Sequence, residues 1–164
     1  MNKQEIYELI EKKNIWNEKT EHGEVFTMED LAAIELPYPE YDAKNIFVRD
    51  EKKINYYLIT VKSEKRVDLK EFRRTYGTKN LSFAKAEDLM EILNLIPGSV
   101  SPLGLLNDKE NKVHFYLDKE FTEKDALIGV HPNDNTATLW LKTQDLINII
   151  EENGNRVNII EIKN

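Results

Sequence analysis

The 164-residue sequence contains no cysteine, which excludes disulfide bonds, thiolate catalysis and cysteine-ligated zinc or iron–sulfur sites. Its six glycines and five prolines are too few for a fibrous or low-complexity chain. No apolar run approaches the roughly 20 residues that a membrane-spanning helix needs. The charged N-terminal stretch also lacks the apolar segment of a signal peptide. We therefore expect a cytoplasmic protein with no membrane partner.

The sequence has fewer basic residues than acidic ones. Lysine and arginine together number 23, against 30 aspartates and glutamates, so the net charge is −7. This balance argues against a general nucleic-acid coat and against DNA as a partner, because a polyanion needs a basic surface. Residues 62–79 are the exception, with seven basic residues and three acidic ones. Such a run is usually a solvated helix face, but here it is the best candidate for a local contact with phosphate.

Several motifs of common enzymes are missing. The chain has no GxxxxGK[ST], no GxGxxG and no GxSxG, so interpretations as an NTPase, a dinucleotide-binding protein or a serine hydrolase lack the parts that their mechanisms need. The histidines, His22, His114 and His131, do not show the HxxxH or HxH spacing of a zinc site. We expect no metal and no cofactor.

Hydrophobic residues make up 40% of the chain, enough for the core of one domain that spans residues 1–164. The expected strands are grouped rather than strictly alternating with helices. This order predicts an α+β fold with a mixed, largely antiparallel sheet of about six to seven strands, surrounded by helices. Apolar spacing, capping residues and turn residues predict helices at 2–14, 27–34, 69–76, around 89–93 and at 143–153, and strands at 45–49, 55–61, 81–84, 113–117, 127–130, 136–141 and 157–162.

Polar residues that packing does not explain gather in three places. Lys44 and Asn45 lie at the beginning of the first predicted strand, where a lysine is more often simply solvated. Residues 97–104, PGSVSPLG, join a helix to a strand and have the composition of an ordinary connection. The same loop could instead offer backbone N–H groups to a ligand oxygen, with Gly98 permitting close approach.

The third place is the sequence HPNDNT, residues 131–136, between two predicted strands. A tight polar hairpin turn explains most of this composition. His131, however, stands at the end of a strand, where an imidazole that contacts a ligand would also be placed.

Four segments together resemble one family. Residues 44–50 (KNIFVRD), 95–108 (LIPGSVSPLGLLND) and 131–138 (HPNDNTAT) are similar to the KNLFLRD strand, the LxPGSVTPxGLxND loop and the HPxxNTAT turn of the YbaK/ProX group of prolyl-tRNA editing domains. Residues 21–27 (EHGEVFT) resemble the EHPxVFT segment of that group, with Gly23 in place of the usual proline, which could loosen this loop. The resemblance covers essentially the whole chain and is closest to the free-standing PrdX-like alanyl-tRNA(Pro) deacylases.

The resemblance implies hydrolysis of the ester that joins a wrong amino acid to the terminal ribose of proline tRNA. An aminoacyl ester is already activated, so a positioned water and stabilisation of the developing oxyanion suffice without a covalent nucleophile. By resemblance Lys44 is the central functional residue. We expect it to hold the ester or the terminal phosphate by its fixed charge, with proton transfer by a desolvated lysine as the alternative. The Gly98 and Ser99 amides would hold the carbonyl oxygen, Asn45 and His131 would orient the ribose hydroxyls and adenine, and Val100, Pro102, Asn133 and Thr136 would contact the substrate.

Selectivity for alanine over proline requires a steric wall, because favourable contacts distinguish one methylene by only about 1–3 kcal/mol. The resemblance places this wall at Ile15, Val25 and Met28, each of which could equally be core. The PGSV sequence favours alanine, with cysteine as the alternative for a larger pocket. A non-catalytic module that binds tRNA or an amino acid, and a structural partner domain that uses the basic run 62–79, remain rival interpretations.

The expected partner is the acceptor end of tRNA(Pro). An acidic protein can make only a few phosphate contacts near that end, so it would not wrap a whole tRNA. Recognition of the acceptor stem is then either partial or supplied by prolyl-tRNA synthetase.

Overall fold

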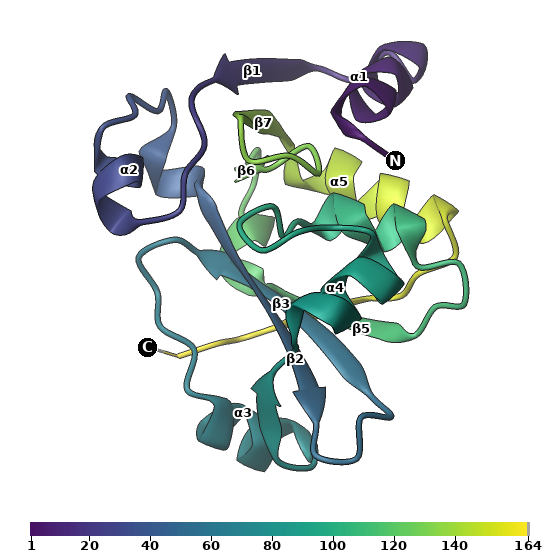
Figure 1. Cartoon of the computed structure of the whole chain (residues 1–164). Coiled ribbons are helices and arrows are strands. Elements are labelled where there is room, and N and C mark those ends of the chain that lie inside the picture. The colour runs from purple at the N-terminus through teal and green to yellow at the C-terminus, as the bar shows by residue number, and fades with distance from the viewer. Residues whose placement is uncertain (164) are drawn as a thin grey trace.

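Two β-sheets meet at the beginning of strand β2 in the computed structural model, which describes residues 1–163 except the side chains of Met28 and Leu31 (Figure 1). The larger sheet has the strand order β4-β2-β3-β5-β8, in which β3, β5 and β8 are parallel and the other pairs are antiparallel. The smaller sheet, β1-β7-β6, is antiparallel throughout. The strands are β1 (Asn17–Glu21), β2 (Ala43–Asp50), β3 (Tyr56–Lys62), β4 (Leu81–Phe83), β5 (Val113–Asp118), β6 (Leu127–Val130), β7 (Ala137–Lys142) and β8 (Val157–Ile160).

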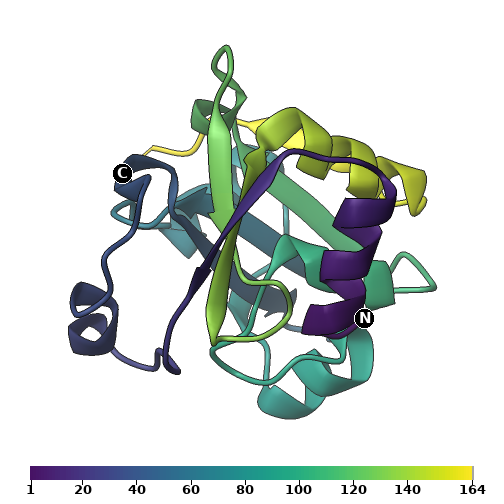
Figure 2. The same ribbon diagram turned by 90° about the horizontal axis from the view of Figure 1, so that it is seen from above.

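Helices connect and cover these sheets. The α-helices are α1 (Lys3–Lys12), α2 (Met28–Ala32), α3 (Leu69–Tyr76), α4 (Ala86–Leu93) and α5 (Thr143–Glu152), and the 3-10 helices are η1 (Pro39–Tyr41), η2 (Pro102–Asn107) and η3 (Lys119–Thr122). Across residues 1–163, no helix is both long enough and apolar enough to cross a bilayer. Figure 2 shows β1 running alongside β7, with α1 at one end and the α2 segment at the other.

Two apolar clusters hold the layers together. The larger one joins one face of the five-stranded sheet to the three-stranded sheet and to α1, α4, α5 and η2, through buried residues such as Ile10, Phe115 and Leu139. The smaller one packs Phe72 of α3 and Ile162 of the C-terminal segment on the opposite face. Burial of this apolar surface is the main force that holds the helices on the sheets.

Besides this apolar packing, one isolated backbone bridge, between Asp42 and Gly129, links the two sheets among the described residues. A Cβ atom at Gly129 would overlap the indole ring of Trp140 on the neighbouring strand β7, so the indole can lie against β6 only because this residue is glycine. The bridge holds the beginning of β2 against β6. The two sheets therefore meet beside Lys44 and Asn45.

The α+β class is confirmed, and most predicted elements lie where the patterns put them. The expected sheet is divided into two, and its eight strands in the described chain include β1, which the patterns missed. This strand, NEKTE, has no apolar residue to produce an alternating pattern, and it forms by pairing with β7. The helix expected over 27–34 ends at Ala32, although the predicted capping contacts between Thr27 and Asp30 are present. Thr143 begins α5 instead of capping it.

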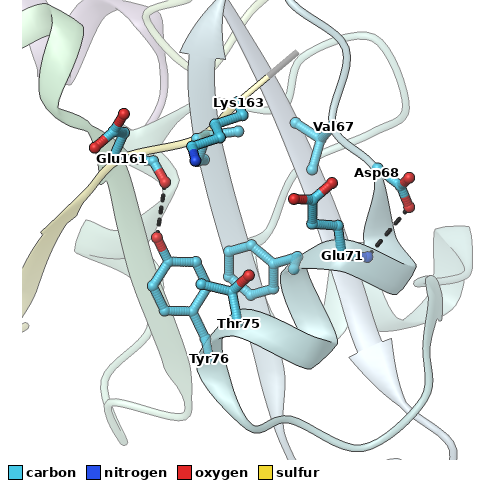
Figure 3. A pocket seen from close by; sticks show the side chains of 9 residues that line it. Val67, Asp68, Glu71, Thr75, Tyr76, Glu161 and Lys163 are labelled. Atoms are coloured by element: carbon cyan, nitrogen blue, oxygen red, sulfur yellow. Dashed lines mark hydrogen bonds between the residues drawn. The ribbon is translucent and has the colours of Figure 1, made fainter.

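The C-terminal segment runs across the larger sheet beside α3, and a small cavity of about 100 Å³ lies between the segment and the helix (Figure 3). Tyr76 donates a hydrogen bond to the carbonyl of Glu161 at 2.8 Å, which ties the segment to the helix. The lining of this small cavity contains none of the motif residues that the sequence singled out. We therefore assign it a packing role.

Candidate active site

A cavity of about 270 Å³ lies where three of the four motif segments meet the beginning of β2. It brings together six of the predicted site residues, Val25, Lys44, Asn45, Gly98, Val100 and His131. The neighbouring residues Lys44 and Asn45 point to opposite faces of a strand, so a cavity that both line must wrap around the end of β2. The rest of the lining consists of His22, Ile34, Leu36, Asp42, Ala43, Ser63 and Thr138.

Lys44 contributes the positive charge that lines this cavity. Its ammonium has no hydrogen-bond or ion-pair partner in the part of the chain that the structure describes. Burial lowers the pKa of Lys44, and the nearby positive charge of Arg66 lowers it further. An unpaired, half-buried ammonium is a binding site for a negatively charged or strongly polarised oxygen.

The loop after α4 presents Gly98 to the cavity in a conformation that favours glycine. Gly98 has a φ of +93°, and within residues 1–163 neither its amide nor that of Val100 has an internal acceptor. The Ser99 amide, in contrast, donates to the Ile96 carbonyl at 3.0 Å. Two backbone donors, at Gly98 and Val100, are thus available to a ligand.

Gly98 also packs closely on two other motif segments. A Cβ atom at this position would lie 3.2 Å from Asn135 Nδ2 and 3.5 Å from the ring of Phe26. Asn135 is itself buried and donates to the carbonyl of Val25 at 3.5 Å. The three segments therefore fix one another around Gly98.

We expect Gly98→Ala to lower the free energy of unfolding by about 1–3 kcal/mol, because the positive φ strains an L side chain and Asn135 must move. Gly77→Ala is the matched control, since Gly77 has a φ of +69° but no atom near the added methyl. Urea denaturation of both variants measures the difference. Equal losses would mean that the contact with Asn135 adds nothing to the strain.

Two histidines form one wall of the cavity. His131 Nδ1 donates to the Ala137 carbonyl at 3.0 Å, so its Nε2 is the acceptor when the ring is neutral. Burial lowers the pKa of His131, which favours that neutral form. His22 lies edge-on to it with ring centroids 6.5 Å apart, and its Nε2 accepts from the Thr138 hydroxyl at 3.2 Å.

Asn45 is oriented by a partner on the neighbouring strand. The buried hydroxyl of Thr60, opposite it in the β2–β3 register, donates to Asn45 Oδ1 at 2.6 Å. The acceptor of the Asn45 amide is thereby engaged. Its NH₂ group is the part left for a ligand.

Asp42, two residues before Lys44, is the functional candidate that the sequence analysis missed. It is the one acid in the described lining of the cavity. Burial raises its pKa to about 6, although hydrogen bonds from the Ser63 hydroxyl and the Ala43 amide lower it in part. Its position next to the KN motif was a usable signal, but an aspartate before a strand is more often a turn residue.

Five predicted site residues lie outside this lining. Ile15 packs against the larger apolar cluster, Ser99 is buried beneath the loop, and Pro102 is buried at the beginning of η2. Asn133 donates to the carbonyls of Met1 and Leu103, and the Thr136 hydroxyl is held by Lys3 and Asp134. These side chains are engaged in the fold, and any contact with a ligand stays a prediction. The side chain of Met28 falls outside the described residues.

The basic run 62–79 provides less exposed positive charge near the cavity than its sequence indicates. Lys65 is buried in an ion pair with Asp118, and Lys62 lies over the ring of Tyr41. The remaining cations are exposed, but those of α3 lie beside β4 and the far end of β2, away from the cavity (Figure 1). Arg66 alone is close enough to Lys44 to affect its pKa.

No cluster of three or more His, Asp or Glu side chains suited to a metal occurs in residues 1–163.

Comparison with known proteins agrees with the motifs. The model of the aminoacyl-tRNA editing domain family matches residues 22–149. The prolyl-tRNA editing protein ProX of Acetoanaerobium sticklandii is 36% identical over 160 residues, which cover 98% of this chain and 97% of that protein. The prolyl-tRNA synthetase associated domain-containing protein 1 of Danio rerio is 33% identical over 151 residues, 92% of this chain and 82% of that protein.

Solved structures support the same fold. One reported as a candidate trans-editing enzyme for prolyl tRNA synthetase superposes with a TM-score of 0.69 over 99% of this chain and 96% of that chain. At 19% identity this likeness is evidence for the fold alone. The match to the family model and the near-complete coverage of the relatives decide the family. The chain belongs to the aminoacyl-tRNA editing domain family, as its four motifs predicted.

Proposed function

We propose that this aminoacyl-tRNA deacylase acts in trans on mischarged Ala-tRNA(Pro) and hydrolyses the ester between alanine and the terminal ribose. The observation that carries the proposal is the unpaired Lys44 ammonium in a cavity that also presents the free amides of Gly98 and Val100. Positive charge and backbone N–H groups are the features that stabilise an oxyanion. An ester of this kind needs no more than those features and a positioned water.

In the proposed reaction, water attacks the ester carbonyl carbon and the bond to the ribose oxygen breaks. The attacking water gives up a proton and the ribose oxygen takes one, so the products are alanine and tRNA with a free terminal ribose. The Gly98 and Val100 amides bind the developing oxyanion. Lys44 stabilises the negative charge, either on the oxyanion or on the terminal phosphate, by its fixed charge.

The position of Arg66 supports the proposal that a phosphate of the tRNA binds near the cavity. Its exposed guanidinium is close enough to lower the pKa of Lys44, so two positive charges share this region. The NH₂ group of Asn45 and Nε2 of His131 are then available for ribose hydroxyls and adenine. We propose that the acceptor end of tRNA(Pro) enters here, with prolyl-tRNA synthetase as a further partner for the rest of the tRNA.

Selectivity for a small amino acid is proposed to come from the apolar side of the cavity. Val25, Ile34 and Leu36 line it, and they can oppose the ring of proline while leaving space for a methyl group. Exclusion by a wall discriminates more strongly than attraction, because overlap costs more than one methylene gains.

We expect Ala-tRNA(Pro) to be deacylated faster than Cys-, Ser- or Pro-tRNA(Pro) when the four substrates are compared at equal concentration. Release of labelled amino acid measures the rates. Ala-tRNA with an unrelated acceptor stem is the control for tRNA recognition. A faster reaction with Cys-tRNA(Pro) would replace alanine by cysteine as the substrate, and tight binding without hydrolysis of any ester would indicate a non-catalytic module.

A further inference from the structure

Asp42 lines the cavity from a main chain that is held on both sides. Its backbone carbonyl accepts from the Ser63 amide at 2.8 Å on one side, and it forms the bridge to Gly129 on the other. Asp42 also ends the 3-10 helix η1 immediately before β2 begins. The main chain around this carboxylate is therefore fixed by three elements. The Cα atom of Asp42 thus has a defined position at the beginning of β2, two residues before Lys44.

This carboxylate has no positive partner in the described protein. Its hydrogen-bond donors, the Ser63 hydroxyl and the Ala43 amide, are both neutral, and no cation contributes to its pKa shift. Burial nevertheless leaves its pKa at about 6, so the group is mostly ionised at neutral pH. A half-buried anion without a cation is unfavourable, and a ligand that supplies a positive charge relieves this cost.

The end of an aminoacyl-tRNA carries one positive charge. Its phosphates are negative, and its adenine, ribose and ester are neutral, so only the α-ammonium of the amino acid can pair with a carboxylate. We propose that Asp42 binds the α-ammonium group of the aminoacyl ester, an inference that rests on the proposed deacylase function. The protein then recognises the free amino group of the aminoacyl ester as well as its small side chain. Esters whose α-nitrogen is acylated, such as peptidyl-tRNA, are disfavoured.

This assignment divides the cavity by charge. Asp42 receives the positive end of the aminoacyl group, while Lys44, two residues along the chain, faces the oxyanion or phosphate. The ester carbonyl lies two bonds from the α-nitrogen, so a contact at Asp42 also fixes the carbonyl relative to the loop amides. Asp42 is thus a substrate-binding residue that helps to set the geometry of attack.

The test compares alanyl-tRNA(Pro) with lactyl-tRNA(Pro), in which a hydroxyl replaces the α-ammonium in a group of nearly the same size. We expect Asp42→Asn to lower kcat/KM for the alanyl ester by about 10–100-fold, the usual effect of losing a charge-assisted hydrogen bond. The lactyl ester should react equally well with both proteins. The ratio of the two substrates cancels their different intrinsic reactivities and any partial loss of folded protein.

Two results would overturn the assignment. An equal loss on both esters would mean that Asp42 acts on the water or holds the loop, and an unchanged alanyl rate would mean that it does not touch the substrate. Asp42→Ser, read by the same ratio, replaces Asp42→Asn if that variant does not fold. Wild-type protein that hydrolyses no aminoacyl-tRNA would instead reject the deacylase function itself, which separates the two failures.

Discussion

Lys44→Ala is expected to lower kcat/KM for Ala-tRNA(Pro) by about 10²–10³-fold, the usual effect of removing one group that stabilises an oxyanion. The ammonium is half-buried and unpaired, so it has no evident structural partner to lose. The expected effect is therefore on catalysis, with little change in the free energy of unfolding. Deacylation rates under single-turnover conditions, together with urea denaturation, separate these two quantities.

Two further variants sharpen this experiment. Lys70→Ala removes an exposed lysine from α3, away from the cavity, and should leave the rate unchanged. Lys44→Arg retains the charge but changes its shape, so partial activity would favour electrostatic stabilisation over proton transfer, because an arginine does not release its proton. Full activity of Lys44→Ala would remove Lys44 from the mechanism.

The activity should also depend on pH in a defined direction. A fixed positive charge at Lys44 is lost as the pH rises through its pKa, and burial together with Arg66 has lowered that pKa. Activity that needs the charged form should therefore decline at a lower pH than an exposed lysine would cause. Arg66 is exposed, so salt should weaken its part of this shift.

The family and most of the fold could be predicted from the sequence because the informative residues lie in continuous segments. The KN pair lies at the beginning of β2, the PGSV loop joins α4 to η2, and the HPNDNT turn joins β6 to β7. Apolar periodicity then located the five α-helices and all strands except β1, but none of the three 3-10 helices. That strand is polar and depends on β7, a partner more than a hundred residues away, so no local pattern marks it.

Side-chain directions within the motifs could not be predicted in the same way. In the PGSV loop, Gly98 is exposed to the cavity while the next residue, Ser99, is buried, since neighbouring residues in a turn face different ways. Asn133 likewise turns toward Leu103 instead of the cavity. Asp42 was missed because its importance comes from what surrounds it in space, a bridge to β6 and a hydrogen bond to Ser63.

Lys65 is the clearest example of a residue whose sequence context misleads, and its replacement should have the largest effect on stability. It belongs to the basic run 62–79, yet it is buried and contacts Asp118 at 2.5 Å, as well as Glu120. The Asp118 side chain is 0% exposed. Burial alone would lower the pKa of Lys65, but the hydrogen bonds to these two carboxylates hold it above its usual value.

Lys65→Met should lower the free energy of unfolding by about 3–5 kcal/mol, because it leaves Asp118 as an uncompensated buried charge. The double variant Lys65→Met with Asp118→Leu should recover much of this loss, since removal of both charges also removes the cost of burying them. Lys70→Met, at an exposed position of the same basic run, should stay within about 0.5 kcal/mol of the wild type. Urea denaturation measures all three. A double variant no more stable than Lys65→Met would show that packing of the lysine stem, rather than its charge, holds η3 against the sheet.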